Sequence, residues 1–509
     1  MKILNPALKS YIKLRWSVID NFLLNPIETQ IKTFNSLISS AQYTEIGREY
    51  GFGNITKISE FKKEVPVHSY EDMVPYINRM MQGQQNVLWR APISWFAKSS
   101  GTTSEKSKFL PVSNEQLEDC HYKAGKDILA LYYRNFPQSK LLAGKALLLG
   151  GSHQVNQLNA ESYYGDLSAV MLQNMSMLQH LIRTPDLSIA LMDEWEEKID
   201  KMAESTINDD VTFLAGVPTW TLVLLNKIRE KTGEDDIHKV WPNLELYIHG
   251  GVNFKPYEEQ FKTYFPSQPI SYLETYNASE GFFAAQDLLG TQNGMLLFLN
   301  HGIFFEFMPL EEDGKEFPNT LQLDEVELNK NYAIIISTNS GLWRYKIGDT
   351  IAFTSLNPFR IKVTGRTKHF INAFGEELII DNAEHAISEA AKATQVHIND
   401  YTAAPIYFSG NKNGAHQWLI ECNIKEARQE AFINILDLEL QKVNSDYEAK
   451  RYKNLALRKP EVLFLEEGTF NRWLKSKNKQ GGQHKVPRLS NDRLFIEEIL
   501  KFAGLESVA

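Results

Sequence analysis

The sequence predicts an α/β protein with a large N-terminal domain and a small α+β C-terminal domain. Apolar runs of strand length alternate with helical patterns between about residues 145 and 338, which is typical of a substantially parallel sheet with flanking helices. The pattern changes after about Gly365. A chain of 509 residues is also too long for one ordinary hydrophobic core. We therefore predict domains at 1–367 and 368–509.

The elements of the N-terminal part follow from periodicity and capping. Most of the first hundred residues have helical spacing, and Ser113 with Gln116 forms a capping-box start for a helix to about Phe136. We expect an antiparallel hairpin from the runs 295–300 and 303–308, which His301-Gly302 joins. The other expected elements are strands 145–152, 211–217, 244–249, 270–274 and 332–338 and helices 187–202 and 219–231.

The C-terminal part is predicted to be a unit of about 140 residues, within the usual range for a domain. Its pattern predicts a helix near 382–393, strands 406–409 and 417–423, a long amphipathic helix 425–444 and a further strand 462–466. The sequence contains no internal repeat or low-complexity linker. The boundary is therefore expected to be a short hinge.

Composition narrows the class of protein. Hydrophobic residues make up 43% of the chain and charged residues 23%, as in soluble globular proteins. A formal net charge of −9 argues against nucleic-acid binding. Two distant cysteines suit a reducing compartment. The sequence has no membrane-length apolar run and no signal-peptide pattern. We predict a cytoplasmic protein without a membrane or nucleic-acid partner.

Residues 99–108 (SSGTTSEKSK) have the composition of a phosphate-binding loop. Backbone N–H groups, hydroxyls and a lysine can converge on one anion. The loop lacks the Walker spacing, so it indicates another use of ATP, the activation of a carboxylate by AMP transfer. An ordinary Ser/Thr/Gly turn is the alternative.

Two acidic positions follow predicted strands. Glu280 lies in the segment 276–281 (YNASEG), where its carboxylate can hold Mg²⁺ against phosphate oxygens. Asp349 follows a glycine in the segment 342–350 (LWRYKIGDT), where it can accept both hydroxyls of a ribose. The alternatives are a solvated turn glutamate and a β-turn aspartate.

Two basic segments belong to the C-terminal part or its boundary. Residues 365–368 (GRTK) lie at the compositional boundary, and residues 481–488 (GGQHKVPR) can present Lys485 to a site elsewhere. The alternative for both is a solvated charged loop.

In their order and spacing these segments resemble the adenylate-forming superfamily, in which a small C-terminal domain moves on a hinge. The closer resemblance is to the Gretchen Hagen (auxin-responsive promoter) family of acyl acid–amido synthetases, and it extends from about residue 99 to 488. The phosphate loop has one extra residue before its lysine and continues into Leu110-Pro111, and Lys368 occupies a hinge position that is Asp in most of the superfamily. Residues 483–488 (QHKVPR), preceded by 468–470 (GTF), are similar to that family's Gln-Tyr-Lys-x-Pro-Arg.

The resemblance implies a use of ATP and Mg²⁺ and a role for each matching position. Lys485, Glu280 and Lys108 would be catalytic, with Glu280 beside Mg²⁺, and Lys368 would be the hinge. Asp349 would hold the ribose. The remaining expected ATP-binding residues are Ser99, Ser100, Gly101, Thr102, Thr103, Gly250, Gly251, Tyr276, Ser279 and Arg366.

The resemblance also implies two substrates, a small carboxylic acid and an amine, for which an amino acid is expected. Val217, Trp220 and His153 are candidates for the acyl pocket, and a structural tryptophan and a core histidine are the alternatives. The protein is expected to be a monomer or homodimer. An acyl-CoA ligase and a non-catalytic nucleotide-binding regulator are the competing functions.

Overall fold

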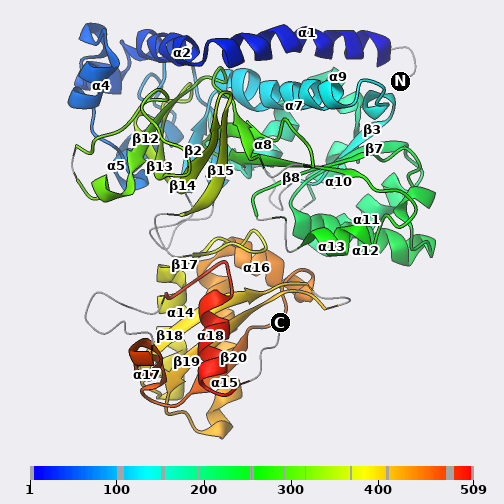
Figure 1. The fold of residues 1–509 in the computed structure, drawn as a ribbon, viewed down its shortest axis with the longest axis vertical. Helices are drawn as coiled ribbons and strands as arrows, with labels where there is room; N and C mark the ends of the chain where they lie inside the picture. The colour runs from blue at the N-terminus through cyan, green and yellow to red at the C-terminus, as the bar shows by residue number, and fades with distance from the viewer. Residues whose placement is uncertain are drawn as a thin grey trace.

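The computed structural model of this chain forms two bodies of different size (Figure 1). It describes residues 5–99, 108–150, 155–192, 194–252, 254, 257–290, 293–315, 317–366, 370–408, 412–476 and 487–505. The side chains of residues 5–8, 178, 366 and 471 are outside this description. The larger body, coloured blue to green, ends with the strand that reaches Arg366, and the smaller body, coloured yellow to red, begins at Phe370.

The larger body is built on a mixed sheet, in which eleven strands are described. Its order is β12, β13, β14, β15, β11, β10, β9, β8, β7, β3, β6. The strands from β9 to β6 run parallel, and the pairs from β12 to β9 are antiparallel. In the same order the bounds are Ile303–Pro309, Asn331–Thr338, Tyr345–Leu356, Phe359–Arg366, Met295–Leu297, Gly281–Ala285, Ser271–Ala278, Leu246–Gly250, Val211–Ala215, Lys145–Leu148 and Arg183–Thr184.

A smaller sheet carries the two ends of the expected phosphate loop. Its order is β2 (Lys108–Val112), β1 (Trp95–Ser99), β5 (Tyr163–Gly165) and β4 (Asn156–Gln157). The helices of the larger body are α1 (Asn5–Leu24), α2 (Pro26–Ala41), α3 (Glu45–Glu49), α4 (Ile58–Glu64), α5 (Tyr70–Met81), α6 (Asn114–Gln116), α7 (Tyr122–Asn135), α8 (Leu167–Asn174), α9 (Met177–Leu181), α10 (Leu187–Ala190), α11 (Trp195–Thr206), α12 (Pro218–Thr232) and α13 (Glu258–Lys262).

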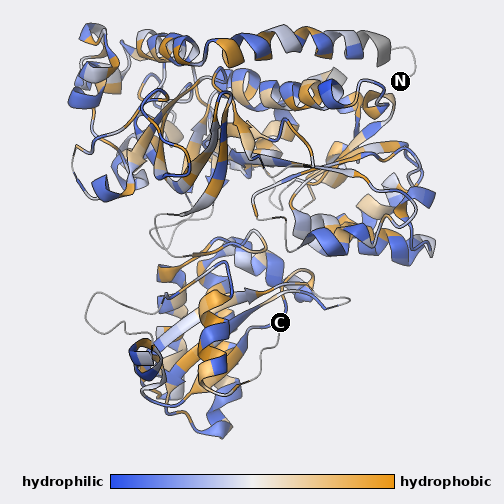
Figure 2. Ribbon diagram, in the orientation of Figure 1, coloured by the Kyte–Doolittle hydropathy of each residue, from blue (hydrophilic) through white to orange (hydrophobic). Residues whose placement is uncertain are grey.

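The smaller body packs helices on a three-stranded sheet with the order β18 (Ile398–Ile406), β19 (Ala415–Cys422), β20 (Glu461–Leu465). A short hairpin of β16 (Phe370–Ile371) and β17 (Leu378–Ile379) precedes it. The helices are α14 (Ile380–Thr394), α15 (Glu426–Val443), α16 (Ser445–Arg451), α17 (Thr469–Ser476) and α18 (Leu494–Phe502). Hydrophobic and hydrophilic residues alternate along α18 (Figure 2), which buries Ile496, Ile499 and Leu500.

Most of the predicted elements are present. The predicted strands correspond to β3, β7, β8, β9 and β13, and Ser113 caps the helix that follows it by accepting from Gln116 N at 2.9 Å. The prediction of a mostly helical first hundred residues missed β1, which starts at Trp95.

The predicted hairpin of residues 295–308 is wrong. β11 pairs with β10 and β15, whereas β12 pairs with β13 at the edge of the sheet. The connection between them is held inside the body, where Gln30 Nε2 donates to Leu299 O and Ile303 O at 2.8 and 2.9 Å. Both strands are buried along their whole length, so no alternation of polar residues marks a partner.

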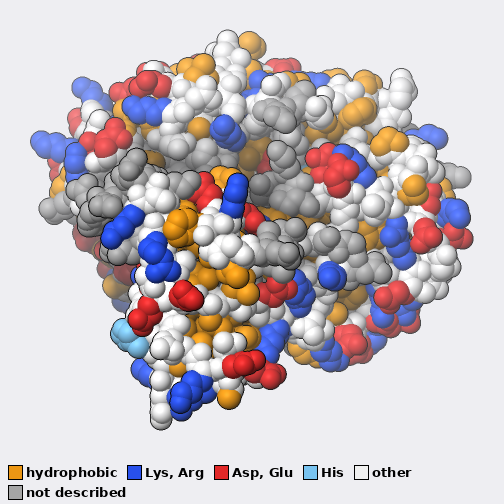
Figure 3. Space-filling view, turned by 60° about the horizontal axis from the view of Figure 1, so that its bottom comes forward, with side chains coloured by type: hydrophobic (Ala, Val, Ile, Leu, Met, Phe, Trp, Pro, Cys, Tyr) orange, Lys and Arg blue, Asp and Glu red, His pale blue; other side chains and the backbone are white. Residues whose placement is uncertain are grey.

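The surface carries charges of both signs. Lys and Arg are interspersed with Asp and Glu over the face in Figure 3. Among the described residues, none of the helices combines the length and the apolarity that crossing a membrane requires.

Candidate functional site

A cavity of about 1430 Å³ is lined by residues of both bodies. Its wall includes the C-terminal ends of the parallel strands β7 and β8, where ligands gather in α/β sheets. The predicted site residues that line it are Ser99, Lys108, Val217, Trp220, Gly250, Gly251, Tyr276, Ser279, Glu280 and Asp349. The predicted Ser100, Gly101, Thr102, Thr103, His153, Lys368 and Lys485 lie outside the described residues.

The expected phosphate loop joins two paired strands. Ser99 at the end of β1 is the register partner of Lys108 at the start of β2. Lys108 is buried, and its Nζ lies 5.2 Å from the centroid of the Tyr70 ring. The Tyr70 hydroxyl accepts from Phe109 N at 2.8 Å, which fixes the start of β2. The strand pair thus holds both ends of the loop at the cavity.

Glu280 occupies the turn between β9 and β10 and is 7% exposed. Burial raises the pKa of its carboxyl to about 7, the neighbouring Lys108 lowers it, and Asp349 and Glu377 raise it further. Gln116 Nε2 donates to the Glu280 carbonyl at 2.9 Å and holds the turn. The carboxyl therefore sits between a buried cation and other carboxylates, in a place where a bound cation would change its charge.

Tyr276 and Asp349 are joined by a hydrogen bond of 2.7 Å, in which the Tyr276 hydroxyl donates. Both residues lie within strands, Tyr276 in β9 and Asp349 in β14, so the predicted position of Tyr276 after a strand end is wrong and the alternative of a β-turn aspartate does not apply. The reason at Asp349 is a bulge in β14, where Gly348 has a φ of +99°. The bulge changes the direction of the strand, and the strand continues beyond it.

Two glycines bring β8 close to its neighbours. A Cβ at Gly250 would lie 2.6 Å from Thr275 O, so no larger residue fits beside β9. Gly251 has a φ of +81°, and its carbonyl accepts from Asn372 Nδ2 of the smaller body at 3.0 Å. Both glycines line the cavity together with Tyr276. Arg366 ends β15 opposite Asp349 in register.

Trp220 of α12 has both a structural and a lining position. Its ring stacks on Trp195 with a centroid separation of 3.7 Å and an interplanar angle of 7°. The side chain is 5% exposed, and it lines the cavity with Val217. Lys450 Nζ of the smaller body lies 4.9 Å from its ring centroid. Trp220 is therefore both a buried structural tryptophan and a residue that lines the cavity.

Sequence reasoning missed several cavity residues. His121 lies in a π-helix, Leu117–His121, and neither ring nitrogen has a partner within the described part of the chain. Burial lowers the pKa of His121 to about 4. Asp166, Asp446 and Lys450 also line the cavity. The π-helix at His121, a feature frequent at functional sites, is visible only in the structure, and the other three residues have no motif around them.

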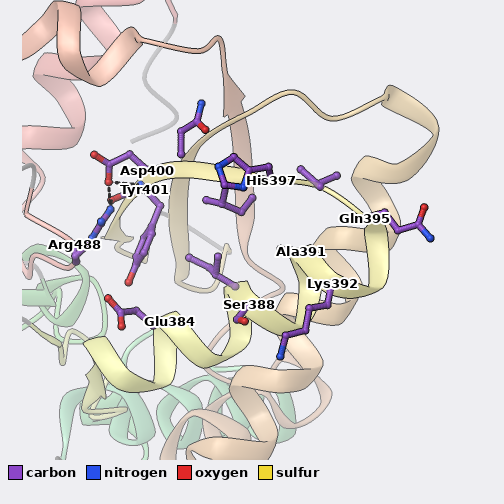
Figure 4. Close-up of a pocket in the computed structure, with 13 residues that line it drawn as sticks. Glu384, Ser388, Ala391, Lys392, Gln395, His397, Asp400, Tyr401 and Arg488 are labelled. Atoms are coloured by element: carbon purple, nitrogen blue, oxygen red, sulfur yellow. Dashed lines mark hydrogen bonds and ion pairs between the residues drawn. The ribbon is translucent and has the colours of Figure 1, made fainter.

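A second cavity of about 450 Å³ lies in the smaller body between α14 and β18 (Figure 4). Arg488 stands at its side, paired with Asp400 and 4.6 Å from the Tyr401 ring centroid. Thr402 Oγ1 donates to Pro487 O at 2.6 Å, and Ala403 N donates to Arg488 O at 3.0 Å. The chain that follows the predicted Lys485 is thus attached to the edge of β18.

The structure defines an α/β protein with a C-terminal α+β body and a large cavity that residues of both bodies line. The sequence matches the GH3 family N-terminal domain over residues 15–270, the central domain over 296–366 and the C-terminal domain over 381–494. The chain belongs to the GH3 family, which confirms the resemblance to the Gretchen Hagen family.

Curated relatives extend over nearly the whole chain. Indole-3-acetic acid-amido synthetase GH3.3 of Arabidopsis thaliana is 21% identical and covers 95% of this chain and 92% of its own length. The 4-substituted benzoates-glutamate ligase GH3.12 of Arabidopsis thaliana is 22% identical and covers 84% of this chain and 87% of its own length. Jasmonoyl–L-amino acid synthetase GH3.5 of Oryza sativa subsp. japonica is 23% identical and covers 91% of this chain and 91% of its own length.

Solved structures show the same fold. The AtGH3.15 acyl acid amido synthetase in complex with 2,4-DB matches with a TM-score of 0.64 at 18% identity, over 97% of this chain and 96% of that chain. A 2-hydroxyisobutyryl-CoA ligase in complex with 2-HIB-AMP and CoA matches with a TM-score of 0.57 at 12% identity, over 94% and 92%. The predicted α/β fold with a smaller C-terminal domain is confirmed.

Proposed function

We propose that this protein is an ATP-dependent acyl acid–amido synthetase. A carboxylate oxygen of a small acid attacks the α-phosphorus of ATP, which forms an acyl-AMP and releases pyrophosphate. The nitrogen of an amino acid then attacks the acyl carbon, the bond to AMP breaks, and the amine loses a proton as the amide forms. The observation that supports this most is one cavity that contains Lys108, Glu280 and the Tyr276–Asp349 pair. The names of the relatives support the same reaction class.

The nucleoside is assigned to the end of the cavity at β8 and β9. Asp349 offers a carboxylate for the ribose hydroxyls, and its hydrogen bond to Tyr276 fixes its orientation. The Tyr276 ring, Gly250 and Gly251 line this end of the cavity and are assigned to the adenine. A charge-assisted hydrogen bond contributes roughly 1.5–3 kcal/mol, so this carboxylate is expected to be a main determinant of ATP affinity.

The phosphates are assigned to Ser99, Lys108 and the loop between them. Lys108 supplies a buried positive charge, which offsets the repulsion between an acid and the phosphates. The Glu280 carboxylate fits Mg²⁺, because this ion keeps several waters and takes one or two carboxylates together with substrate phosphates. Bound there, Mg²⁺ would neutralise phosphate charge and assist pyrophosphate departure. Glu280 must be ionised to hold it.

The acyl group is assigned to the region of Val217 and Trp220. Lys485 is assigned the role of contacting the α-phosphate during adenylation. Because residues of both bodies line the cavity, an acyl-adenylate bound there would be partly enclosed by protein. A moving C-terminal domain, with Lys368 at the hinge, would allow one chain to perform both half-reactions. A cytoplasmic monomer or homodimer remains part of the proposal.

The test is pyrophosphate release from ATP and Mg²⁺ across a panel of small carboxylic acids, with and without mixed amino acids. The expected result is release that depends on one acid, with an amide found by mass spectrometry only after an amino acid is added. Release without an amide, but with a thioester when CoA is supplied, would favour an acyl-CoA ligase. ATP binding without release for any acid would favour a regulatory protein.

A further inference from the structure

Lys450 is a buried cation at the boundary between the two bodies. It belongs to α16 of the smaller body and lines the large cavity, with 7% of its surface exposed. A Cβ at Gly375 would lie 3.7 Å from its Nζ, so the ammonium packs directly against that backbone. Burial lowers the pKa of this lysine. Its position is fixed by Leu457 N, which donates to the Lys450 carbonyl at 2.8 Å.

The ammonium group of Lys450 has no hydrogen bond or ion pair with any residue that the structure describes. The nearby Glu376 is already occupied, because its two oxygens accept from Phe374 N and from His416 Nε2, each at 2.7 Å. The Trp220 face offers a cation–π interaction at 4.9 Å, which supplies no formal negative charge. A buried charge is costly without a directly bound anion, so the side chain is suited to an anionic group of a ligand in the cavity.

Two carboxylates share this wall with Lys450. Asp446 lies one helical turn before it on α16, and Asp166 precedes α8 of the larger body. Both line the cavity and act electrostatically on the lysine. One cation beside two carboxylates suits a zwitterion, whose carboxylate and ammonium groups find opposite charges. A second carboxylate of a dicarboxylic acyl acid would instead meet two like charges.

The contacts of Lys450 place it beside Val217 and Trp220, the residues proposed to hold the acyl group. Gly375, which contacts Lys450, also faces Val217, and Val217 faces Gly251 beside the proposed adenine surface. The carboxylate to be activated belongs near Lys108 and Glu280, at the phosphate end. The acceptor amine must approach the acyl carbon from the side that AMP does not occupy.

We propose that Lys450 binds the carboxylate of the acceptor amino acid and thereby positions its amine. This inference depends on the proposed synthetase function. It assigns Lys450 the role of a specificity-determining residue that distinguishes amino acids from other amines.

The test compares an accepted amino acid with its carboxamide, which keeps the amine and removes the negative charge. In the unmodified protein kcat/KM for amide formation should be at least about tenfold higher with the amino acid, since a charge-assisted hydrogen bond is lost with the carboxamide. Lys450→Met should lose this preference, mainly through a higher KM for the amino acid. Acid-dependent pyrophosphate release without acceptor should fall far less. Lys450→Arg should retain part of the preference.

Lys453→Met is the matched control. Lys453 pairs with Glu196 across the same boundary but does not line the cavity, so the preference should remain. Thermal melting of every variant distinguishes a folding defect from a loss of binding. If Lys450→Met unfolds at a lower temperature, Lys450→Arg, which keeps the positive charge, still tests the role of that charge.

The outcomes distinguish the two levels of the proposal. Absence of acid-dependent pyrophosphate release in the unmodified protein would refute the synthetase itself. Normal release with an unchanged carboxylate preference in folded Lys450→Met would overturn only the role of Lys450. A preference among acyl acids that changes with Lys450, measured by pyrophosphate release, would place the acyl acid there and also overturn it.

Discussion

The Tyr276 hydroxyl donates a 2.7 Å hydrogen bond to Asp349 across two strands that are not neighbours. Tyr276 lies in β9 and Asp349 in β14, and β10, β11 and β15 stand between them in the sheet. Both side chains are buried, at 8% and 7% exposure. The bond therefore ties the two walls of the proposed nucleoside site together and orients the carboxylate.

Asp349→Ala should weaken ATP binding by about tenfold or more, because charge-assisted hydrogen bonds to the ribose are lost. Tyr276→Phe should have a smaller effect, since the ring and the carboxylate both remain. Isothermal titration calorimetry with ATP measures both variants. An ATP affinity of Asp349→Ala equal to that of the unmodified protein would show that Asp349 has only a structural role.

Binding of ATP with Mg²⁺ should tighten as the pH rises toward about 7 and then level off. Burial raises the pKa of Glu280 to about 7, so the carboxyl is protonated below that pH. A bound cation favours the carboxylate, and binding then releases a proton. Glu280→Gln cannot ionise, so its affinity should be weak and nearly independent of pH. Titrations in buffers of different ionisation enthalpy detect the released proton, and equal pH profiles for the two proteins would contradict the assignment.

The same raised pKa has a consequence for the unliganded protein. A carboxyl whose folded pKa is raised contributes stability below its unfolded pKa, and that stability is lost as the pH rises through the folded value. For Glu280 the loss falls between the ordinary glutamate pKa of 4.5 and about 7. Urea denaturation over this range should show less pH dependence for Glu280→Gln.

Lys485→Ala should severely reduce acid-dependent pyrophosphate release and leave the melting temperature unchanged. The expected reason is the loss of a cation at the α-phosphate, where charge develops in the transition state. The control is Lys475→Ala, which removes a lysine at the end of α17, ahead of the same segment. Normal pyrophosphate release from Lys485→Ala would refute its catalytic role.

Arg344→Met should destabilise the fold by about 3–5 kcal/mol, because it leaves a buried carboxylate without its partner. Arg344 pairs with Glu306 at 2.9 Å, and both side chains are 1% exposed. Its Nη1 also donates to Val65 O at 2.6 Å, which attaches the start of β14 to the N-terminal helical region. Urea denaturation measures the loss.

Lys346→Met is the control in the same segment. The Lys346–Asp313 pair is partly exposed, so its removal should cost only about 0–1 kcal/mol. Similar losses for the two variants would mean that the burial of the Arg344–Glu306 pair is energetically unimportant.

The site could be predicted in part because its chemistry is local in sequence. The segments around Lys108, Glu280 and Asp349 each carry their own glycine, hydroxyl or charge pattern, and their order supported the resemblance to one family. Lys450 could not be found in this way, because an ordinary helical stretch surrounds it. Its burial as a cation results from the packing of α16 against Trp220, which is distant in the sequence.

The sequence by itself determined the α/β class, the capped helix after Ser113, the parallel strands β3, β7 and β8, and the family. These depend on periodicity, capping and motif order within short segments. The tertiary structure alone decided that β11 and β12 do not pair, that Tyr276 reaches Asp349, and that Glu280 has a raised pKa. The physical reason is that strand pairing, burial and electrostatic environment depend on residues distant in the chain, which no local pattern specifies.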